Sequence, residues 1–203
     1  MLLPKAGTLL VMDTPQPIAP AARIGRLFAR CDRLEQRWCL SLNRWSGRPA
    51  VRHFFAAISR LGDGVFWYTL MVLLPVVFAT PGLLAAGHMA LTGLVGLAVY
   101  KTLKSRLVRE RPFIANGRIV CQTPPLDRYS FPSGHTLQAV LFSTVAIAWF
   151  PVLALLLVPF AMLVAMSRVI LGLHYPSDVV VGAALGLTLA LIALGLFPPI
   201  LHN

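Results

Sequence analysis

The stretch from residue 64 to residue 100 contains no Asp, Glu, Lys or Arg, and this absence of charge is the strongest constraint on the fold. A membrane-spanning helix needs about 20 apolar residues, so the stretch is too long for a single crossing. The sequence Thr-Pro-Gly at residues 80–82 interrupts it. We therefore predict two membrane helices, one over residues 64–79 and one over residues 83–103.

Two later segments have the same character. Residues 136–167 are also uncharged and break near Pro151, which predicts two more membrane helices, and residues 179–201 predict a fifth. Charged residues make up 12% of the chain, whereas a soluble domain carries about 25%. The sequence therefore predicts an all-α fold, a polytopic membrane helical bundle with about five transmembrane helices in one compact domain.

The segments before the first membrane helix differ from the rest. Residues 1–20 lack a continuous apolar core and end Pro-rich, so we interpret them as a disordered lead. In residues 21–62, apolar residues and arginines recur at helical spacing on different faces. The arginines of this pattern are Arg23, Arg26, Arg30, Arg33 and Arg37. The pattern predicts an amphipathic helix in the membrane interface with its basic face toward anionic lipid headgroups. A solvated helix packed on the bundle is the alternative. Residues 63–203 would then form the transmembrane catalytic domain.

The charge of the chain points to an anionic partner. Its 18 Lys and Arg residues outnumber its 7 Asp and Glu residues, which gives a net charge of +11. Nucleic acid is excluded as a partner because most of the chain would lie in lipid. Lipid headgroups and phosphorylated substrates remain. The three cysteines show no spacing typical of metal ligands.

Alternation of five crossings places residues 1–63, 104–131 and 168–178 on the same side of the membrane. The 104–131 connection begins with the sequence KSRLVRERP. If this segment is helical, Lys104 and Arg111 face the same direction, because seven residues make about two turns. Taken singly, Arg106 and Arg109 are typical of lipid anchors at a membrane edge.

Two further polar clusters lie on that side. The sequence Pro-Ser-Gly-His opens the third membrane helix, where the backbone N–H groups of Ser133 and Gly134 would be free to bind an anion. The segment SRVILGLHYPSD supplies Arg168, His174 and Asp178. Pro176 suits the first turn of the fifth helix, which places His174 just ahead of it. Cations, a helix N-terminus and two histidines together describe a phosphate site, in which one imidazole attacks and the other protonates a leaving oxygen.

These three clusters match, in order, the motifs Lys-x6-Arg-Pro, Pro-Ser-Gly-His and Ser-Arg-x5-His-x3-Asp, and every fixed position is filled. Through them the chain resembles the type 2 phosphatidic acid phosphatase (PAP2) superfamily. The motifs cover residues 101–180, and the arrangement of membrane helices extends the resemblance to about residue 203. The resemblance is specific for the superfamily but does not identify a substrate.

The resemblance implies a role for each motif residue. His174 would be the nucleophile that forms a phosphohistidine, which water then hydrolyses. Asp178 would accept the other imidazole N–H, and His135 would be the general acid. The phosphoryl oxygens would be held by Lys104, Arg111, Ser133, Gly134 and Arg168. The family implies no metal and no cofactor, and the sequence contains no carboxylate cluster of the kind that holds one.

The function predicted from these features is removal of a terminal phosphate from a membrane lipid phosphate or diphosphate. Undecaprenyl diphosphate, phosphatidylglycerol phosphate, phosphatidic acid and lipid A phosphates are the substrate types of similar bacterial proteins, and the compact plan resembles the undecaprenyl diphosphate phosphatases. One alternative is a phosphotransferase, in which a second lipid replaces water. Another is a non-enzymatic anion-binding membrane protein, which would leave His135, His174 and Asp178 unexplained.

The sequence indicates an integral membrane protein of the bacterial inner membrane and leaves its orientation and its oligomeric state open. All 18 Lys and Arg residues fall on the side of the motifs, which favours a cytoplasmic site by the positive-inside rule. Much of the resembling family works on the outer face. Of the remaining polar residues, Asp63 is expected to cap the first membrane helix, and His88 to bond to a neighbouring helix.

Overall fold

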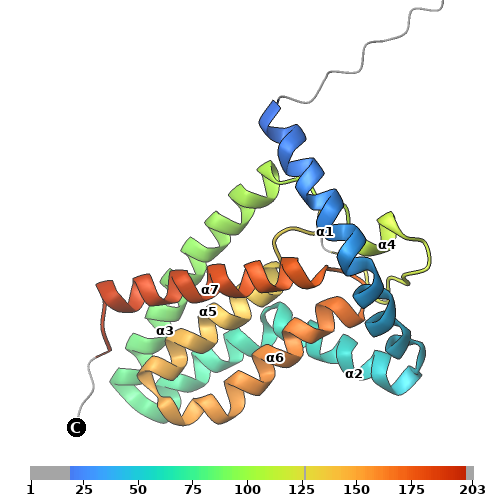
Figure 1. Ribbon diagram of the computed structural model, residues 1–203. Coiled ribbons are helices and arrows are strands. Elements are labelled where there is room, and N and C mark those ends of the chain that lie inside the picture. Colours follow the sequence, from blue (N-terminus) through green and yellow to red (C-terminus); the bar gives the residue numbers. More distant parts are fainter. Residues whose placement is uncertain (1–18, 126, 200–203) are drawn as a thin grey trace, which may run out of the picture.

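The computed structural model describes residues 19–125 and 127–199, and all of the regular elements in these ranges are helical (Figure 1). The α-helices are α1 (Ala19–Asn43), α2 (Pro49–Arg60), α3 (Phe66–Arg106), α4 (Pro112–Ala115), α5 (Gly134–Trp149), α6 (Ala154–Ile170) and α7 (Pro176–Leu196). Three short turns of other helix types join them, at Arg44–Gly47, Leu61–Val65 and Pro151–Leu153. The all-α prediction is confirmed. The predicted disordered lead lies outside the described residues except for Ala19 and Pro20, which begin α1.

Helix α3 is two helical arms joined by a sharp reversal. Ala79 has non-helical dihedral angles (φ 50°, ψ −130°). A Cβ atom added to Gly82 would lie 2.0 Å from the carbonyl oxygen of Leu74, which is possible only because the chain has turned back on itself. Figure 1 shows the two arms side by side at the start of the second arm. The division predicted at residues 80–82 is therefore correct to within a few residues.

The remaining predicted membrane helices also have counterparts in the structure. Helices α5 and α6 are separated at Pro151, and α7 begins at Pro176, as the sequence indicated. Three described helical stretches are long and apolar enough to cross a membrane: Pro49–Arg106, which contains the reversal at Ala79, Pro151–Ile170 and Pro176–Leu196. Their outer surfaces are apolar, with Leu155 84% and Val76 76% exposed. Such a surface suits lipid rather than water.

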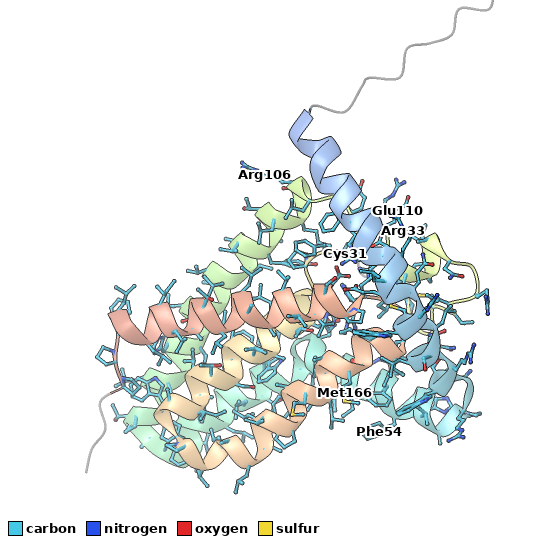
Figure 2. The ribbon with its side chains drawn as sticks, viewed as in Figure 1. Cys31, Arg33, Phe54, Arg106, Glu110 and Met166 are labelled. Atoms are coloured by element: carbon cyan, nitrogen blue, oxygen red, sulfur yellow. The ribbon has the colours of Figure 1, made fainter. Side chains whose placement is uncertain are left out.

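The polar residues gather at one end of the bundle. Helices α1 and α4 lie there, beside the end of α6 and the start of α7 (Figure 1). Figure 2 shows Arg33, Arg106 and Glu110 at this end, away from the apolar helix surfaces. On α1, exposed Leu34 and Trp38 lie next in sequence to the exposed Arg33 and Arg37. That this helix is amphipathic and lies in the membrane interface stays a prediction.

Helices α5 and α7 cross with their backbones in contact. A Cβ atom on Gly182 would lie 2.5 Å from the carbonyl oxygen of Ser133, and one on Gly186 would lie 2.3 Å from that of Leu137. This Gly-x3-Gly pair is typical of close helix contacts in membranes. The backbone N–H of Ser133 donates to the carbonyl oxygen of Asp178 (3.1 Å) at the same crossing. The second and third motifs are held together in this way.

We expect Gly186→Leu to separate α5 from α7. Overpacking a core costs about 1–3 kcal/mol, and here the obstacle is backbone, so we expect a cost of about 3 kcal/mol or more. The matched control is Gly195→Leu on the same helix, because nothing lies within 4 Å of a Cβ at that position. Thermal unfolding in detergent measures the effect. Equal melting temperatures for the two variants would contradict the predicted close contact.

Candidate active site

The three motifs converge at the polar end of the bundle. Lys104 lies near the end of α3, Arg111 precedes α4, Ser133 and Gly134 begin α5, Arg168 lies near the end of α6, and His174 and Asp178 flank the start of α7. All of these residues except Gly134 are buried. Buried cations are costly in a membrane protein and mark functional sites. The structure therefore brings the predicted residues together.

His174 is oriented by the turn between α6 and α7. Gly172 has a positive φ of 78°, which only glycine adopts readily, and this turn returns the chain toward α7. The imidazole Nδ1 lies 3.6 Å from Oδ2 of Asp178, just beyond hydrogen-bond distance, and that oxygen accepts the backbone N–H of Tyr175 (2.9 Å). The other ring nitrogen, Nε2, lies 3.4 Å from Nη1 of Arg111. An Nδ1–H directed at the carboxylate leaves the Nε2 lone pair facing the cations.

The environment of His174 favours its neutral form. Burial lowers the pKa of His174 well below its usual value, and the nearby positive charges of Arg168 and Arg111 lower it further. A neutral imidazole is the form that can act as a nucleophile. At neutral pH the imidazole of His174 is therefore uncharged.

Lys104 and Arg111 converge through a loop and not through a helix. Helix α3 ends at Arg106, and Arg111 has extended backbone angles (φ −75°, ψ 152°). The segment from Lys104 to Arg111 is therefore not one continuous helix, and helical spacing does not align the two cations. Their convergence is nevertheless real, because Lys104 Nζ and Arg111 Nη2 each lie 2.7 Å from the same atom, Oδ1 of Asp127.

Asp127 is a site residue that the sequence did not reveal. Its Oδ2 accepts a hydrogen bond from the Tyr100 hydroxyl (2.7 Å), and its backbone carbonyl accepts one from Arg111 Nε (3.0 Å). Burial acts to raise the pKa of Asp127, but hydrogen bonds from Lys104 and Tyr100 outweigh it and lower that pKa. Asp127 is therefore an ionised carboxylate lying between the two cations that the first motif assigns to phosphate.

His135 faces a second unexpected carboxylate. Its Nε2 lies 3.3 Å from Oδ1 of Asp63, which belongs to the π-helical turn Leu61–Val65. Asp63 makes no capping hydrogen bond to α3, so its predicted role as a helix cap is wrong. On the same side of the site, Arg168 donates through Nη1 to the hydroxyl of Ser59 on α2. The segment before the first membrane helix therefore contributes to the site.

The start of α5 offers one fewer anion-binding group than predicted. The backbone N–H of Ser133 is already bonded to the carbonyl of Asp178, and its hydroxyl lies 2.9 Å from that of Thr136. Gly134 is the first residue of the helix, and the first N–H groups of a helix have no partner within it. Gly134 is thus better placed than Ser133 to donate to a bound anion.

Arg109 is buried and not exposed to lipid headgroups. It donates through Nη1 to Oδ1 of Asp178 and to the Ser177 hydroxyl (2.7 Å). The prediction that it anchors the protein to lipid is wrong. Its position within the first motif was the only signal in the sequence that could have connected it with the site. Arg106, by contrast, is exposed at the end of α3.

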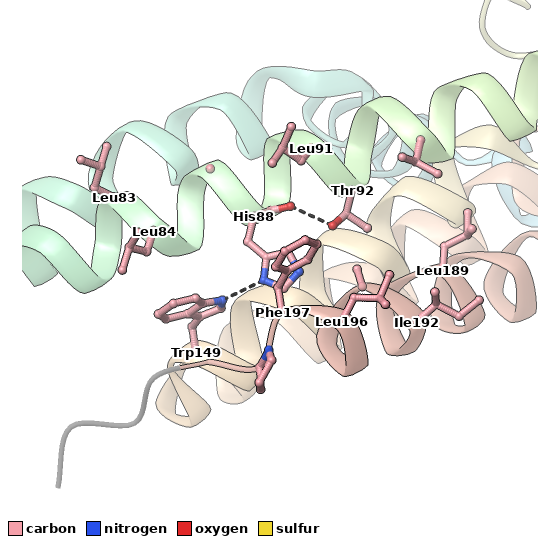
Figure 3. A pocket seen from close by; sticks show the side chains of 14 residues that line it. Leu83, Leu84, His88, Leu91, Thr92, Trp149, Leu189, Ile192, Leu196 and Phe197 are labelled. Carbon is pink, nitrogen blue, oxygen red and sulfur yellow. Dashed lines mark hydrogen bonds between the residues drawn. The ribbon is translucent and has the colours of Figure 1, made fainter.

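The far end of the bundle holds a separate apolar cavity. It measures about 670 Å³ and lies between α3 and α7, with His88 and Trp149 on its wall (Figure 3). Trp149 Nε1 donates to Nδ1 of His88 (3.2 Å), so the predicted bond to a neighbouring helix is confirmed. Trp149 is the last residue of α5 and His135 is the second, so about 20 Å of helix separates this cavity from the site.

Comparison with known proteins identifies the family. The PAP2 superfamily matches residues 81–200. A decaprenylphosphoryl-5-phosphoribose phosphatase of Mycobacterium tuberculosis is 33% identical over 150 residues, which cover 71% of this chain and 80% of that protein. Among solved structures, Aquifex aeolicus LpxE superposes with a TM-score of 0.69 at 25% identity, covering 80% of this chain and 95% of that one.

A second solved structure has the same fold. The PAP2-type phosphatidylglycerolphosphate phosphatase of Bacillus subtilis superposes with a TM-score of 0.65 at 23% identity, covering 91% of this chain and 99% of that one. This similarity extends beyond the three motifs to nearly the whole membrane bundle. Together with the apolar helices, these comparisons show that the chain is an integral membrane protein of the PAP2 superfamily, whose relatives are phosphatases of membrane lipid and polyprenyl phosphates.

Proposed function

We propose that this protein hydrolyses the terminal phosphate of a membrane lipid phosphate or diphosphate through a phosphohistidine intermediate. The observation that carries the proposal is the position of His174, between the carboxylate of Asp178 and the buried cations Arg111 and Arg168, at the polar end of an apolar bundle. A lipid reaches this depth with its tail among the helices and its phosphate at the cations. A soluble phosphate ester has no apolar tail that could pack among the helices.

In the first step, the phosphoryl oxygens bind to Lys104, Arg111 and Arg168, with the Gly134 N–H as a further donor. Nε2 of His174 attacks phosphorus, and the bond from phosphorus to the leaving oxygen breaks. His135, the proposed general acid, takes up a proton from solvent when the bound phosphate dianion offsets the charges of Arg168 and Arg111, and it gives this proton to the leaving oxygen.

In the second step, water attacks the phosphohistidine and gives its proton to His135. The P–N bond breaks, phosphate leaves, and both imidazoles return to their starting states. Asp178 stays ionised throughout and stabilises the positive imidazole ring of the intermediate. The cations supply the charge that metal ions supply in other phosphatases, so we propose a metal-independent reaction.

The test is a substrate panel with the purified full-length protein. It includes undecaprenyl diphosphate, phosphatidylglycerol phosphate, short-chain phosphatidic acid, a lipid A phosphate and a polyprenylphosphoryl phosphoribose, the last because of the mycobacterial relative. We expect labelled phosphate to be released as free phosphate from at least one of these lipids. Label that moves instead to a second lipid would establish a phosphotransferase, and no turnover of any lipid would overturn the proposal.

We also propose that the protein resides in the bacterial inner membrane, with anionic headgroups at the basic α1. The exposed arginines at the site end favour a cytoplasmic site by the positive-inside rule. Reporter fusions at the two termini test this orientation. Five crossings require the termini to report opposite sides, and a site on the outer face would place the N-terminus outside.

Asp127 competes with phosphate for the same cations in this scheme. We expect Asp127→Asn to lower the inhibition constant of vanadate about 10-fold, because a charge-assisted hydrogen bond contributes about 1.5–3 kcal/mol and vanadate no longer has to displace a carboxylate. The control is Glu110→Gln, which removes an exposed acid from the same connection between α3 and α5. An inhibition constant that is unchanged or higher in Asp127→Asn would show that the carboxylate does not occupy the anion site.

A further inference from the structure

Arg109 occupies a buried position that the proposed reaction does not use. Its exposed fraction is 2%, and it lies in the loop between α3 and α4, two residues before Arg111. A buried guanidinium needs anionic partners to offset its lost hydration. The partners of Arg109 are carboxylates on two other helices.

The guanidinium of Arg109 joins the start of α7 to α1. Nη1 donates to Asp178 Oδ1 and to the Ser177 hydroxyl, both on α7. Nε and Nη2 donate to Oδ1 of Asp32 (2.9 and 2.7 Å), and Nη2 also lies 3.2 Å from Oε2 of Glu35, both on α1. Ser177 in turn donates to Glu35 (2.9 Å). The planar guanidinium of Arg109, a rigid fork of N–H donors, therefore binds three carboxylates from two helices.

Aromatic rings hold the plane of this fork. The Arg109 guanidinium carbon lies 4.0 Å from the centre of the Tyr175 ring and 5.2 Å from that of Phe28 on α1. Cations and guanidinium planes bind favourably to aromatic faces at these distances. Tyr175 is the neighbour of His174 in the chain, so the fork is fixed directly beside the proposed nucleophile.

Arg109 also completes the coordination of Asp178. That residue has an exposed fraction of 0%. Its Oδ2 faces the Tyr175 N–H and His174 Nδ1, whereas Arg109 binds Oδ1. A fully buried carboxylate without a cation takes up a proton, and a protonated Asp178 is a poorer acceptor for the imidazole N–H. Burial raises the pKa of Asp178, and the charge of Arg109 is the strongest influence that lowers it.

We infer that Arg109 is a positioning residue, which keeps Asp178 ionised and oriented behind His174 and fastens α1, through Asp32 and Glu35, to the reaction centre. The inference rests on the proposed roles of His174 and Asp178. It gives α1 a function beyond contact with headgroups, because this helix supplies two of the three carboxylates that hold the fork.

The first experiment compares Arg109→Met with Arg109→Lys and with the control Arg106→Met, which removes the same charge from an exposed position. The full-length proteins are purified in detergent and assayed on a lipid phosphate that the wild-type protein turns over. We expect Arg109→Met to lower kcat about 100-fold with a KM within about threefold, since losing an orienting carboxylate outright costs about 10⁴-fold in a known triad. We expect Arg109→Lys to recover part of the loss and Arg106→Met to match wild type.

A double-mutant cycle separates positioning from a purely structural role. If Arg109 acts through Asp178, Arg109→Met causes no further loss of kcat in the Asp178→Asn background. Losses that multiply in the double variant would overturn the inference. If Arg109→Met does not fold, the cycle with Arg109→Lys applies the same criterion.

The pH profile provides a second readout. The charged and titratable groups around the pair are Arg111, Arg168, Lys104, Asp127 and His135 on the His174 side, and Arg109, Asp32, Glu35, Tyr175 and Cys39 on the Asp178 side. Removing only the Arg109 charge favours protonation of Asp178, so the acidic limb of kcat/KM moves to higher pH in Arg109→Met and not in Arg106→Met. If the acidic limb of kcat/KM and the value of kcat are both unchanged in Arg109→Met, this inference alone is overturned. If the wild-type protein has no lipid phosphatase activity, the proposed function is overturned.

Discussion

Replacing His174 with Ala is expected to abolish phosphate release, with turnover at least about 10⁴-fold below wild type, as for the loss of nucleophiles in other covalent mechanisms. The substitution removes the Nε2 atom that faces Arg111 and leaves the cations able to bind substrate. We therefore expect kcat to fall far more than substrate affinity. Phosphate release from the lipid identified by the substrate panel is the measurement.

The same variant tests the intermediate itself. After rapid quenching with a substrate labelled in its terminal phosphate, label should remain on wild-type protein and be absent from His174→Ala. His53→Ala is the control, because His53 is an exposed histidine on α2. Unchanged turnover in His174→Ala would remove the catalytic assignment. If the wild-type chain carries no label during turnover, the alternative hypothesis of a non-enzymatic anion-binding protein is favoured.

Replacing Arg111 with Met should have the next largest effect, about 10³-fold in kcat/KM, because a preorganised donor to a developing negative charge contributes about 10²–10³-fold on its own. Arg111 has a second task that adds to this loss. Its Nη1 donates to the carbonyl oxygen of Leu173 (2.8 Å) and so holds the turn that carries His174. Both kcat and KM should therefore worsen.

Arg111→Lys is expected to recover little of this activity. A lysine ammonium is a point charge and cannot reach phosphate, Asp127 and Leu173 with the planar fork of arginine. Arg118→Met is the control, because Arg118 is an exposed arginine in the same connection between α3 and α5. Kinetic constants for Arg111→Met within about threefold of the control would show that Arg111 does not contact the reacting phosphate.

The membrane bundle was predictable because lipid restricts what a chain can do. An uncharged stretch must be helical to satisfy its backbone, and its length sets the number of crossings. The breaks near Ala79 and Pro151 and the start of α7 at Pro176 followed from these rules. The motif residues were predictable as well, because Lys104, Arg111 and His174 stand at spacings that the family shares.

The polar segments between the membrane helices were much less predictable. They have no periodicity, and their side chains pair with residues that are distant in the sequence. Arg109 resembles any arginine at a membrane edge, and only the fold places Asp178, 69 residues later, against it. Asp127 and Asp63 are single acids in polar segments, with no spacing that connects them to Lys104 or His135. The free N–H expected at Ser133 was lost to a bond with α7, which depends on the helix crossing.

The backbone contact between α5 and α7 makes the spacing of the two proposed catalytic histidines independent of most of the sequence. His135 begins α5 and His174 lies just before α7, while Gly182 and Gly186 set how near those helices come. Residues along the outer faces of α3 and α7 can therefore change without altering the distance between His135 and His174. In this chain, the surface that meets lipid tails is thus separated from the groups that we propose for the chemistry.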